Sequence, residues 1–249
     1  MKPTPRVIRF TDADALAQGA ASRLLHALIR FQADDRVAQL CLTGGRIALA
    51  MYSRLGRLVA GSELDPSRLE LWWGDERFVP TDDPDRNAGP ALATLAGHFP
   101  LDPSRTHPMP AADGVVDAAA SAATYAKELG ATRFDLCLLG MGPDGHVASI
   151  FPGHPAEESS GHLVMGVSDS PLPPTERISL TTRAMNRSGE VWFIVSGEDK
   201  ADAVARALTG DHSLPAARVH GHRATVWLLD QAAASRLPYF DCSMQGLSR

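Results

Sequence analysis

Short apolar runs alternate with alanine-rich amphipathic stretches along almost the whole chain, and this alternation limits the possible folds more than any other feature. It is typical of a parallel β-sheet with helices on both faces. The sequence therefore predicts an α/β protein with an open, mainly parallel sheet. The predicted strands are 7–10, 37–42, 69–73, 134–139, 163–167, 191–195 and 225–229, and the predicted helices are 14–31, 47–59, 86–97, 117–129 and 199–208.

The composition fits a folded protein. Apolar residues make up 44% and charged residues 21% of the 249 residues, and the sequence has no long apolar stretch of the membrane-spanning kind. The net charge of −5 comes without a basic block, which argues against nucleic acid or an anionic membrane as the main partner. Loops rich in proline and glycine at 80–89, 100–114 and 152–174 do not form a linker, so we expect one domain over residues 1–249.

The cysteines and the amino end bear on the compartment. Cys41, Cys137 and Cys242 show no spacing typical of a metal or redox site, and the first two lie in apolar runs. We interpret them as reduced core residues. The amino end lacks the apolar core of a secretory signal, so a cytoplasmic location is the default expectation.

The first helix carries a possible start signal, since Thr11 followed by Asp14 resembles a capping box. Chemistry is expected elsewhere, because ligands of open parallel sheets bind beyond the carboxyl ends of the strands. The loops concerned follow Leu42, Trp73 and Leu139.

The turn after the strand 37–42 has the composition of an anion-binding loop. It consists of Thr43, Gly44, Gly45 and Arg46 and runs into a predicted helix. Two glycines let the backbone approach a phosphate, the helix start presents unpaired N–H groups, and the flanking threonine and arginine add donors. An ordinary strand-to-helix turn is the alternative, because turns use glycine freely.

The turn after the strand 69–73 places two carboxylates and a guanidinium at a strand end. These are Asp75, Glu76 and Arg77, which follow Gly74. A planar guanidinium suits bidentate recognition of a phosphate. A solvated charged turn is the alternative interpretation.

The third loop, Gly-Met-Gly-Pro-Asp-Gly-His at 140–146, carries the most information. It contains a G-x-G-x-x-G pattern, and Asp169 could supply the acidic residue of a dinucleotide site. That site also needs a full helix after the glycines, and Pro152 ends the following segment too early. The sequence therefore disfavours a nicotinamide cofactor.

The same loop offers a histidine suited to proton transfer. His146 stands two residues after Asp144 and among glycines that expose its ring. An imidazole titrates near neutrality and can accept a proton from water, and a carboxylate beside it can orient the ring and stabilise its charged form. A purely structural histidine is the alternative, and the surrounding glycines favour catalysis over it.

Two later cations could complete an anion site: Arg177 at the start of an expected strand 176–181, and Lys200 in the first turn of a predicted helix. As isolated features both would more often be solvated charges. Other candidate groups lack support. No carboxylate or cysteine completes a metal set with His212, His220 and His222, and neither Ser149 nor Ser196 stands in a G-x-S-x-G nucleophile turn.

Four motifs occur in order: Leu-Thr-Gly-Gly at 42–45, Gly-Asp-Glu-Arg-Phe-Val-Pro at 74–80, Gly-Met-Gly-Pro-Asp-Gly-His-Val-Ala-Ser-Ile-Phe-Pro at 140–152 and Gly-Glu-Asp-Lys-Ala at 197–201. Together they resemble the 6-phosphogluconolactonases of the glucosamine/galactosamine-6-phosphate isomerase superfamily. The related deaminases usually follow the histidine turn with an Asn-Glu-Pro type sequence, whereas this chain has Ser-Ile-Phe-Pro-Gly at 149–153.

The resemblance implies a three-layer Rossmann-like fold, no cofactor, no required metal, and hydrolysis of 6-phospho-D-glucono-1,5-lactone in the oxidative pentose phosphate pathway. By motif match, His146 would be the general base that activates water, with Asp144 as its neighbour. The residues expected at the substrate and its phosphate are Thr43, Gly44, Gly45, Arg46, Asp75, Arg77, Asn87, Gly142, Arg177 and Lys200.

The chain departs from the common family pattern at two points. Thr-Gly-Gly-Arg-Ile-Ala at 43–48 replaces the commoner Ser-Gly-Gly-Ser-Thr-Pro, and our hypothesis is that Arg46 compensates for the lost hydroxyls. Asp-Arg-Asn at 85–87 replaces Asp-Ser-Asn, so only Asn87 is carried over. The expected partner is a small sugar-phosphate lactone, and the oligomeric state is open between a monomer and a weak homo-oligomer. The alternatives are a sugar-phosphate isomerase or deaminase, a nicotinamide-dependent dehydrogenase and a non-catalytic sensor.

Overall fold

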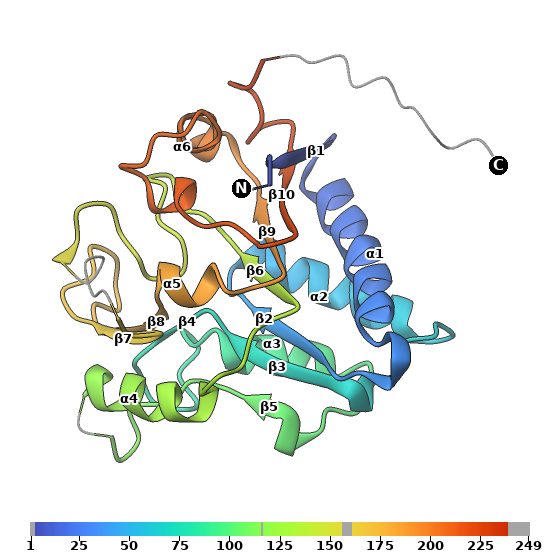
Figure 1. Cartoon of the computed structure of the whole chain (residues 1–249), viewed down its shortest axis with the longest axis vertical. Helices are drawn as coiled ribbons and strands as arrows, with labels where there is room; N and C mark the ends of the chain where they lie inside the picture. The colour runs from blue at the N-terminus through green and yellow to red at the C-terminus, as the bar shows by residue number, and fades with distance from the viewer. Residues whose placement is uncertain (1–2, 116, 156–160, 239–249) are drawn as a thin grey trace.

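A computed structural model describes residues 3–115, 117–155 and 161–238, and its centre is a parallel sheet of seven strands (Figure 1). All neighbouring strands pair in parallel, which confirms the predicted α/β class. In spatial order the strands are β1 (Arg6–Phe10), β10 (Ala224–Asp230), β9 (Glu190–Val195), β6 (Leu136–Leu139), β2 (Ala38–Leu42), β3 (Leu69–Trp73) and β5 (Thr106–His107). The two-residue β5 was not predicted.

A second, three-stranded antiparallel sheet lies beside the first. It contains β4 (Asp75–Arg77), β8 (Arg177–Leu180) and β7 (Val164–Val167). This corrects two expectations, because the segment 75–77 is a strand rather than a turn and the predicted strand 163–167 does not join the main sheet. The N–H of Gly74 donates to the carbonyl of Leu42, and the carbonyl of Gly74 accepts from the N–H of Leu180. Gly74 thus links the two sheets.

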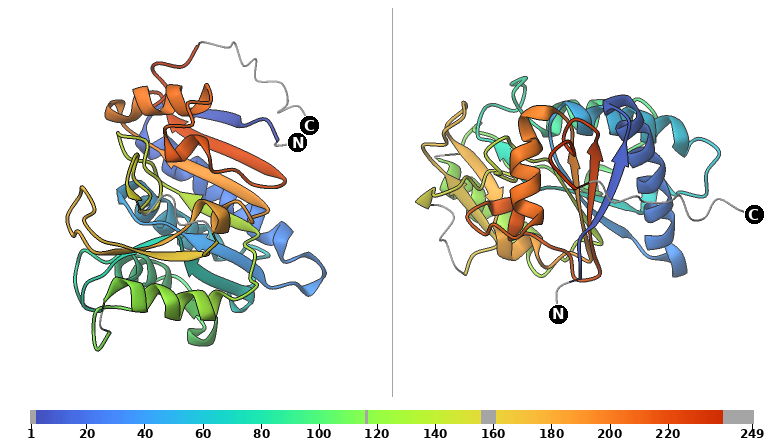
Figure 2. Two further views of the ribbon diagram at one scale, coloured as in Figure 1. Left: turned by 60° about the vertical axis from the view of Figure 1, so that its left-hand side comes forward. Right: turned by 90° about the horizontal axis from the view of Figure 1, so that it is seen from above.

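The helices cover both faces of the main sheet. Seen from above in Figure 2, the strands β1, β10 and β9 lie between α6 and α1. The helix α1 packs on α2, α2 also packs on α3, and α4 packs on the strands of the small sheet. The helices are α1 (Ala13–Phe31), α2 (Arg46–Val59), α3 (Ala88–Ala96), α4 (Ala118–Leu129), the unpredicted single turn α5 (Thr182–Met185) and α6 (Ala201–Leu208).

The start of α1 differs from the predicted capping box. Asp12 is the N-cap residue, and its carboxylate accepts from the N–H of Ala15 at 2.8 Å. Thr11 instead donates its hydroxyl to Asp12. A carboxylate at this position satisfies an unpaired N–H and interacts favourably with the helix dipole, so it takes the place that the sequence suggested for threonine.

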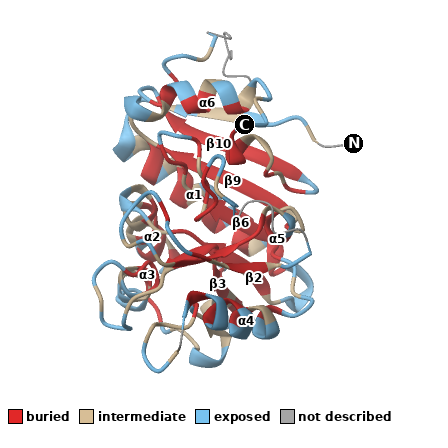
Figure 3. Cartoon of the chain, turned by 90° about the vertical axis from the view of Figure 1, so that its left-hand side faces the viewer, coloured by how far each residue is buried: buried red, intermediate tan, exposed pale blue. Residues whose placement is uncertain are grey.

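The core lies on both faces of the main sheet, whose central strands are buried (Figure 3). Cys41 and Cys137 are buried free thiols, as predicted, and they are register partners in β2 and β6. Cys242 lies outside the described residues. No helix in the described part of the chain is long and apolar enough to cross a membrane.

Two fully buried tyrosines fix the ends of strands that lead into the loops of interest. The hydroxyl of Tyr52 on α2 accepts from the N–H of Thr43 and donates to its carbonyl, at 3.0 and 2.9 Å. The hydroxyl of Tyr125 on α4 does the same for Trp73, at 2.9 and 3.3 Å. Burial raises the pKa of both phenols above the ordinary value, so both hydroxyls keep the proton that they donate.

Candidate active site

A cavity of about 580 Å³ opens at the carboxyl ends of β2, β6 and β9, beside the small sheet. Its wall contains every residue that the sequence analysis assigned to the site except Asp144, which stands behind His146. Parallel strands end at one edge of their sheet, which is why motifs from distant parts of the sequence meet here.

His146 and Asp144 form a close pair. The Nδ1 atom of His146 lies 2.6 Å from Oδ1 of Asp144, which also accepts from the backbone N–H of His146 at 3.1 Å. Burial alone would raise the pKa of the Asp144 carboxyl, but the hydrogen bonds and charge of His146 outweigh it and bring the pKa below its ordinary value. The carboxylate therefore stays ionised and can stabilise a positively charged imidazole.

The other ring nitrogen of His146 is open to the cavity side. No described residue hydrogen-bonds Nε2, and the ring belongs to the cavity wall. The ring of Phe151 lies 4.6 Å from it, centre to centre, and the side chain keeps 18% of its surface exposed. The imidazole is thus held in place with one nitrogen available for proton transfer.

Arg77 is held in place by two acceptors. Its Nη1 atom donates to the carbonyl of Asp85 at 2.6 Å and to Oδ1 of Asn87 at 2.9 Å. Its Nε atom is buried without a partner among the described residues. Asn87 in turn donates its Nδ2 to the carbonyl of Asp75 at 3.0 Å. This fixed guanidinium, with donors left over, suits an anion in the cavity.

Arg177 lies opposite Arg77, since the two are register partners in β8 and β4. Its Nε and Nη2 atoms donate to the carbonyls of Pro174, Leu172 and Pro173. Burial lowers the pKa of this guanidinium from its ordinary value. These bonds leave Nη1 as the guanidinium nitrogen with no hydrogen bond to the described residues, so Nη1 is the group that can donate to a ligand.

Two further cations border the cavity. Lys200 stands at the start of α6, and its Nζ atom donates to the carbonyl of Ser196 at 3.2 Å and lies 3.5 Å from Asp199. Arg46 is the exposed first residue of α2, and its side chain has no ion pair or hydrogen bond with the described residues. With Arg77 and Arg177 these make four cations around one cavity, which favours an anionic ligand.

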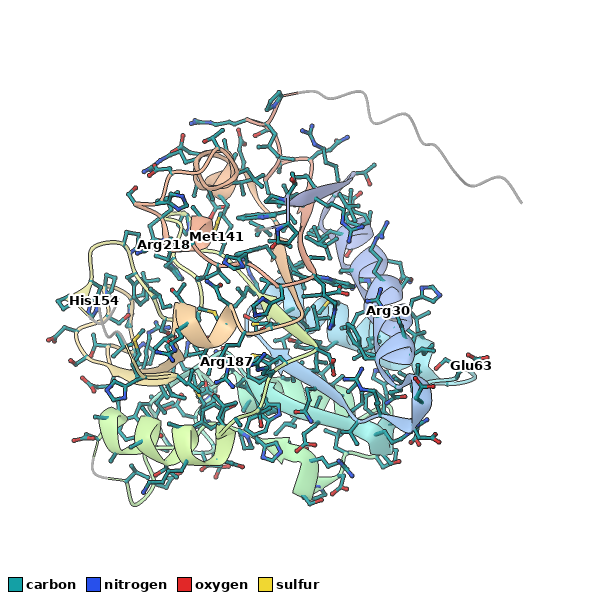
Figure 4. The ribbon with its side chains drawn as sticks, viewed as in Figure 1. Arg30, Glu63, Met141, His154, Arg187 and Arg218 are labelled. Atoms are coloured by element: carbon teal, nitrogen blue, oxygen red, sulfur yellow. The ribbon has the colours of Figure 1, made fainter. Side chains whose placement is uncertain are left out.

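The turn 140–146 is built around close approaches. Gly142 donates its N–H to the carbonyl of His146 and accepts from the N–H of Gly145. A Cβ atom on Gly142 would lie 2.1 Å from both Cε1 and Nδ1 of His146, so only glycine fits beside the ring. Met141 of this turn, labelled in Figure 4, lies below α6 and on the side of the molecule away from Arg30 of α1.

The sequence analysis named Glu76 and Ser149 but missed their supporting roles. Glu76 is fully buried and accepts from the N–H groups of Asn87 and Ala88, which hold the start of α3. Burial raises the pKa of this carboxyl even though Arg86 lies 3.5 Å away. The hydroxyl of Ser149, also fully buried, donates to Oδ2 of Asp75 at 2.8 Å. Ser149 and Asp75 lie 74 residues apart, and no sequence motif predicts a contact over such a separation.

The described residues contain no group of three or more His, Cys, Asp or Glu side chains placed to hold a metal ion. The segment after His146 is not a helix, in agreement with the argument against a dinucleotide site.

Comparison with known proteins identifies the family. The model of the family "Glucosamine-6-phosphate isomerases/6-phosphogluconolactonase" matches residues 11–227. A 6-phosphogluconolactonase of Streptomyces coelicolor is 45% identical, over 96% of this chain and 97% of that protein, and one of Mycobacterium tuberculosis is 42% identical, over 92% and 97%. The structure of 6-phosphogluconolactonase from Thermotoga maritima is similar with a TM-score of 0.79 at 27% identity, over 91% of this chain and 99% of that one. The chain belongs to the glucosamine-6-phosphate isomerase/6-phosphogluconolactonase family.

Proposed function

We propose that this protein hydrolyses 6-phospho-D-glucono-1,5-lactone to 6-phospho-D-gluconate, the lactonase step of the oxidative pentose phosphate pathway. The observation that carries the proposal is the His146–Asp144 pair, whose ring faces a cavity bordered by four cations. The relatives at 42% to 45% identity, which are named 6-phosphogluconolactonases, support it. The activity is that of a carboxylic ester hydrolase.

The phosphate is the part of the substrate that the cations bind. Arg77 is held ready by Asp85 and Asn87, and Lys200 reaches the same cavity from the start of α6. Thr43, Gly44 and Gly45 form the turn at the start of α2, where unpaired N–H groups favour an anion. Arg46 adds a charge beside that turn. Binding the phosphate here fixes the lactone carbonyl relative to His146.

His146 then acts as a general base. Nε2 accepts a proton from water as the water oxygen bonds to the lactone carbonyl carbon. The bond from that carbon to the ring oxygen breaks next, and the imidazolium returns the proton to the departing oxygen. Asp144 stabilises the charged ring between the two transfers, and such a base contributes about 10² to 10⁴-fold to a rate.

The developing negative charge on the carbonyl oxygen needs donors. Among the N–H groups of the turn 140–145, those of Gly140, Gly142 and Gly145 already donate within the protein, and Asp144 does not belong to the cavity wall. The N–H of Met141 donates to no described residue and belongs to a residue of the cavity wall. We assign it as the oxyanion donor.

The remaining expectations are part of the same proposal: a single α/β domain over residues 1–249, a cytoplasmic location, and a monomer or weak homo-oligomer that needs no cofactor or metal. The free thiols of Cys41 and Cys137 fit a reducing compartment.

The decisive experiment uses freshly generated lactone and follows acid release with and without the protein. We expect wild type to exceed spontaneous hydrolysis strongly, and His146→Ala to lose about 10²-fold or more in kcat while still binding 6-phosphogluconate. No rate above the spontaneous one would indicate a sensor. Ammonia release from glucosamine 6-phosphate would indicate a deaminase, and binding of NAD(P) in calorimetry a dehydrogenase.

A further inference from the structure

We propose that Ser149 is a positioning residue of this reaction: its hydroxyl ties the loop that carries His146 to Asp75 and so fixes the imidazole relative to the phosphate-binding cations. The inference rests on the proposed function. Ser149 is not a nucleophile, because it is fully buried and does not belong to the cavity wall.

Ser149 is anchored at both its side chain and its backbone. Its Oγ atom donates to Oδ2 of Asp75 at 2.8 Å, and its N–H donates to Oγ of Ser179 at 3.1 Å. Asp75 and Ser179 are register partners in β4 and β8. Both anchors of the loop thus lie in the small sheet, whereas His146 follows β6 of the main sheet.

The loop between His146 and Ser149 needs such an anchor. Ala148 has a φ of 49°, a left-handed conformation that alanine rarely adopts. Strained residues of this kind persist only where their surroundings determine the backbone on both sides. The His146–Asp144 pair fixes the backbone before Ala148, and the hydrogen bonds of Ser149 fix it after Ala148. The bridge between Val147 and Ile150 closes the turn around it. Loss of the Ser149 hydroxyl frees the strained segment to relax and carry the imidazole with it.

The anchor also connects the base to the phosphate site. Asp75 accepts from Ser149 through Oδ2 and from Asn87 through its carbonyl and Oδ1, and Asn87 accepts from Arg77. One run of hydrogen bonds therefore leads from the loop of His146 to the guanidinium expected to hold the phosphate. The same hydrogen bonds therefore position both the group that binds the phosphate of the lactone and the base that acts on its carbonyl.

The test compares Ser149→Ala with Ser121→Ala. Ser121 is an equally buried serine whose hydroxyl donates to the carbonyl of Pro110 at 2.8 Å, and it does not border the cavity. We expect Ser149→Ala to lower kcat by about tenfold or more, since small misplacements of a catalytic group are costly. KM and the Kd for 6-phosphogluconate should stay within about twofold, because the donors to phosphate are intact. Ser121→Ala should keep wild-type kcat even where its melting temperature falls as far.

A second readout follows the imidazole itself. The Cε1–H resonance of His146 in NMR should move in Ser149→Ala and stay in place in Ser121→Ala. In a double-mutant cycle with Asp75→Asn, the loss in kcat from Ser149→Ala should shrink, because the two groups act through one hydrogen bond.

The outcomes separate this inference from the proposed function. A wild-type protein without lactonase activity would refute the proposed function. An active wild type with equal kcat in the Ser149 and Ser121 variants, or an unmoved His146 resonance, would refute the role of Ser149 alone. A rise in KM without a fall in kcat would also refute it, since Ser149 would then serve substrate binding.

Discussion

The side-chain oxygen of Asn87 occupies the space that a Cβ atom on Gly44 would need, at 1.9 Å from the ideal position of that atom. The same oxygen accepts a hydrogen bond from Arg77. The glycine turn after β2 and the arginine of β4 are therefore held together by one asparagine at the start of α3. The motifs 42–45 and 74–80 therefore meet at this atom.

Gly44→Ala should weaken substrate binding, because the new methyl group displaces Asn87 and with it Arg77. We expect KM to rise by about tenfold, the cost of losing a hydrogen bond between the Arg77 guanidinium and the phosphate, with a smaller change in kcat. Steady-state kinetics checks this. Gly89→Ala is the control, since a Cβ atom at Gly89 in α3 meets nothing within 4 Å. Equal KM values for the two variants would contradict the arrangement.

Gly142→Ala should damage the chemical step instead. Its Cβ atom would lie 2.1 Å from the imidazole of His146 and 2.6 Å from Oδ1 of Asp144, so the pair must separate or turn. We expect kcat to fall by about 10²-fold while the Kd for 6-phosphogluconate, measured by calorimetry, changes little. Unaltered kcat in this variant would show that the position of the ring is not critical.

Asp144→Asn should lower kcat by about 10 to 100-fold, because a neutral amide cannot stabilise the imidazolium. The lowered pKa of Asp144 fixes the pH range of its contribution to stability. The carboxylate favours the folded state at any pH above its ordinary pKa of 3.8, and that contribution is lost as the pH falls through the lower value of the folded protein.

The pH profile of the wild type therefore gives a further check. A loss of activity on acidification that begins well above pH 3.8 must come from a group other than Asp144. Asp102→Asn is the matched control for Asp144→Asn and should keep the kcat of wild type. Hydrogen bonds from Ser104 also lower the pKa of Asp102, but Asp102 does not border the cavity. Wild-type kcat in Asp144→Asn would remove the carboxylate from the mechanism.

Arg77→Ala and Arg46→Ala should both raise KM, and Arg77→Ala should raise it more. Arg77 is fixed by two acceptors before the ligand arrives, whereas Arg46 is exposed and must be ordered on binding. We expect about 10 to 100-fold for Arg77 and a few-fold for Arg46. Arg57→Ala, in the last turn of the same helix as Arg46, should leave KM unchanged. An Arg46 variant with the KM of wild type would end the hypothesis that it replaces the hydroxyls common in relatives.

Tyr52→Phe should lower both stability and affinity. It leaves the buried N–H and carbonyl of Thr43 without partners, at a cost of about 1 to 3 kcal/mol in the free energy of unfolding. Urea unfolding measures the first effect and KM the second. Thr124→Ala removes an exposed hydroxyl bond within α4 and should change neither. A Tyr52→Phe variant with the free energy of unfolding of wild type would show that the end of β2 does not depend on the Tyr52 hydroxyl.

Much of the fold could be predicted because apolar runs mark buried strands directly. The run Leu69–Trp73 was predicted with the bounds that the structure shows, and the helix 14–31 differs by one residue. An apolar run does not predict with which other strand it will pair. Val164–Val167 is as apolar as a main-sheet strand yet pairs with β8, and Asp75–Arg77 has the polar composition of a turn because its strand borders a cavity.

The candidate site could be located for a related reason. Loops after parallel strands converge, so the motifs containing Gly44 and His146 were expected to meet, and they line one cavity. The contacts behind the cavity wall could not be predicted. The bond from Ser149 to Asp75 joins a loop to the strand β4 across 74 residues of sequence, and neither residue has a neighbour in sequence that predicts the other.

The pairing of β4 with β8 also has a consequence for biosynthesis. A ribosome that has released residues 1–176 has produced β4 with no strand beside it, and Lys200 and the strands β9 and β10 emerge later still. The set of four cations around the cavity is therefore complete only after Lys200 has been synthesised. Chains that terminate before Lys200 therefore lack part of the cavity wall.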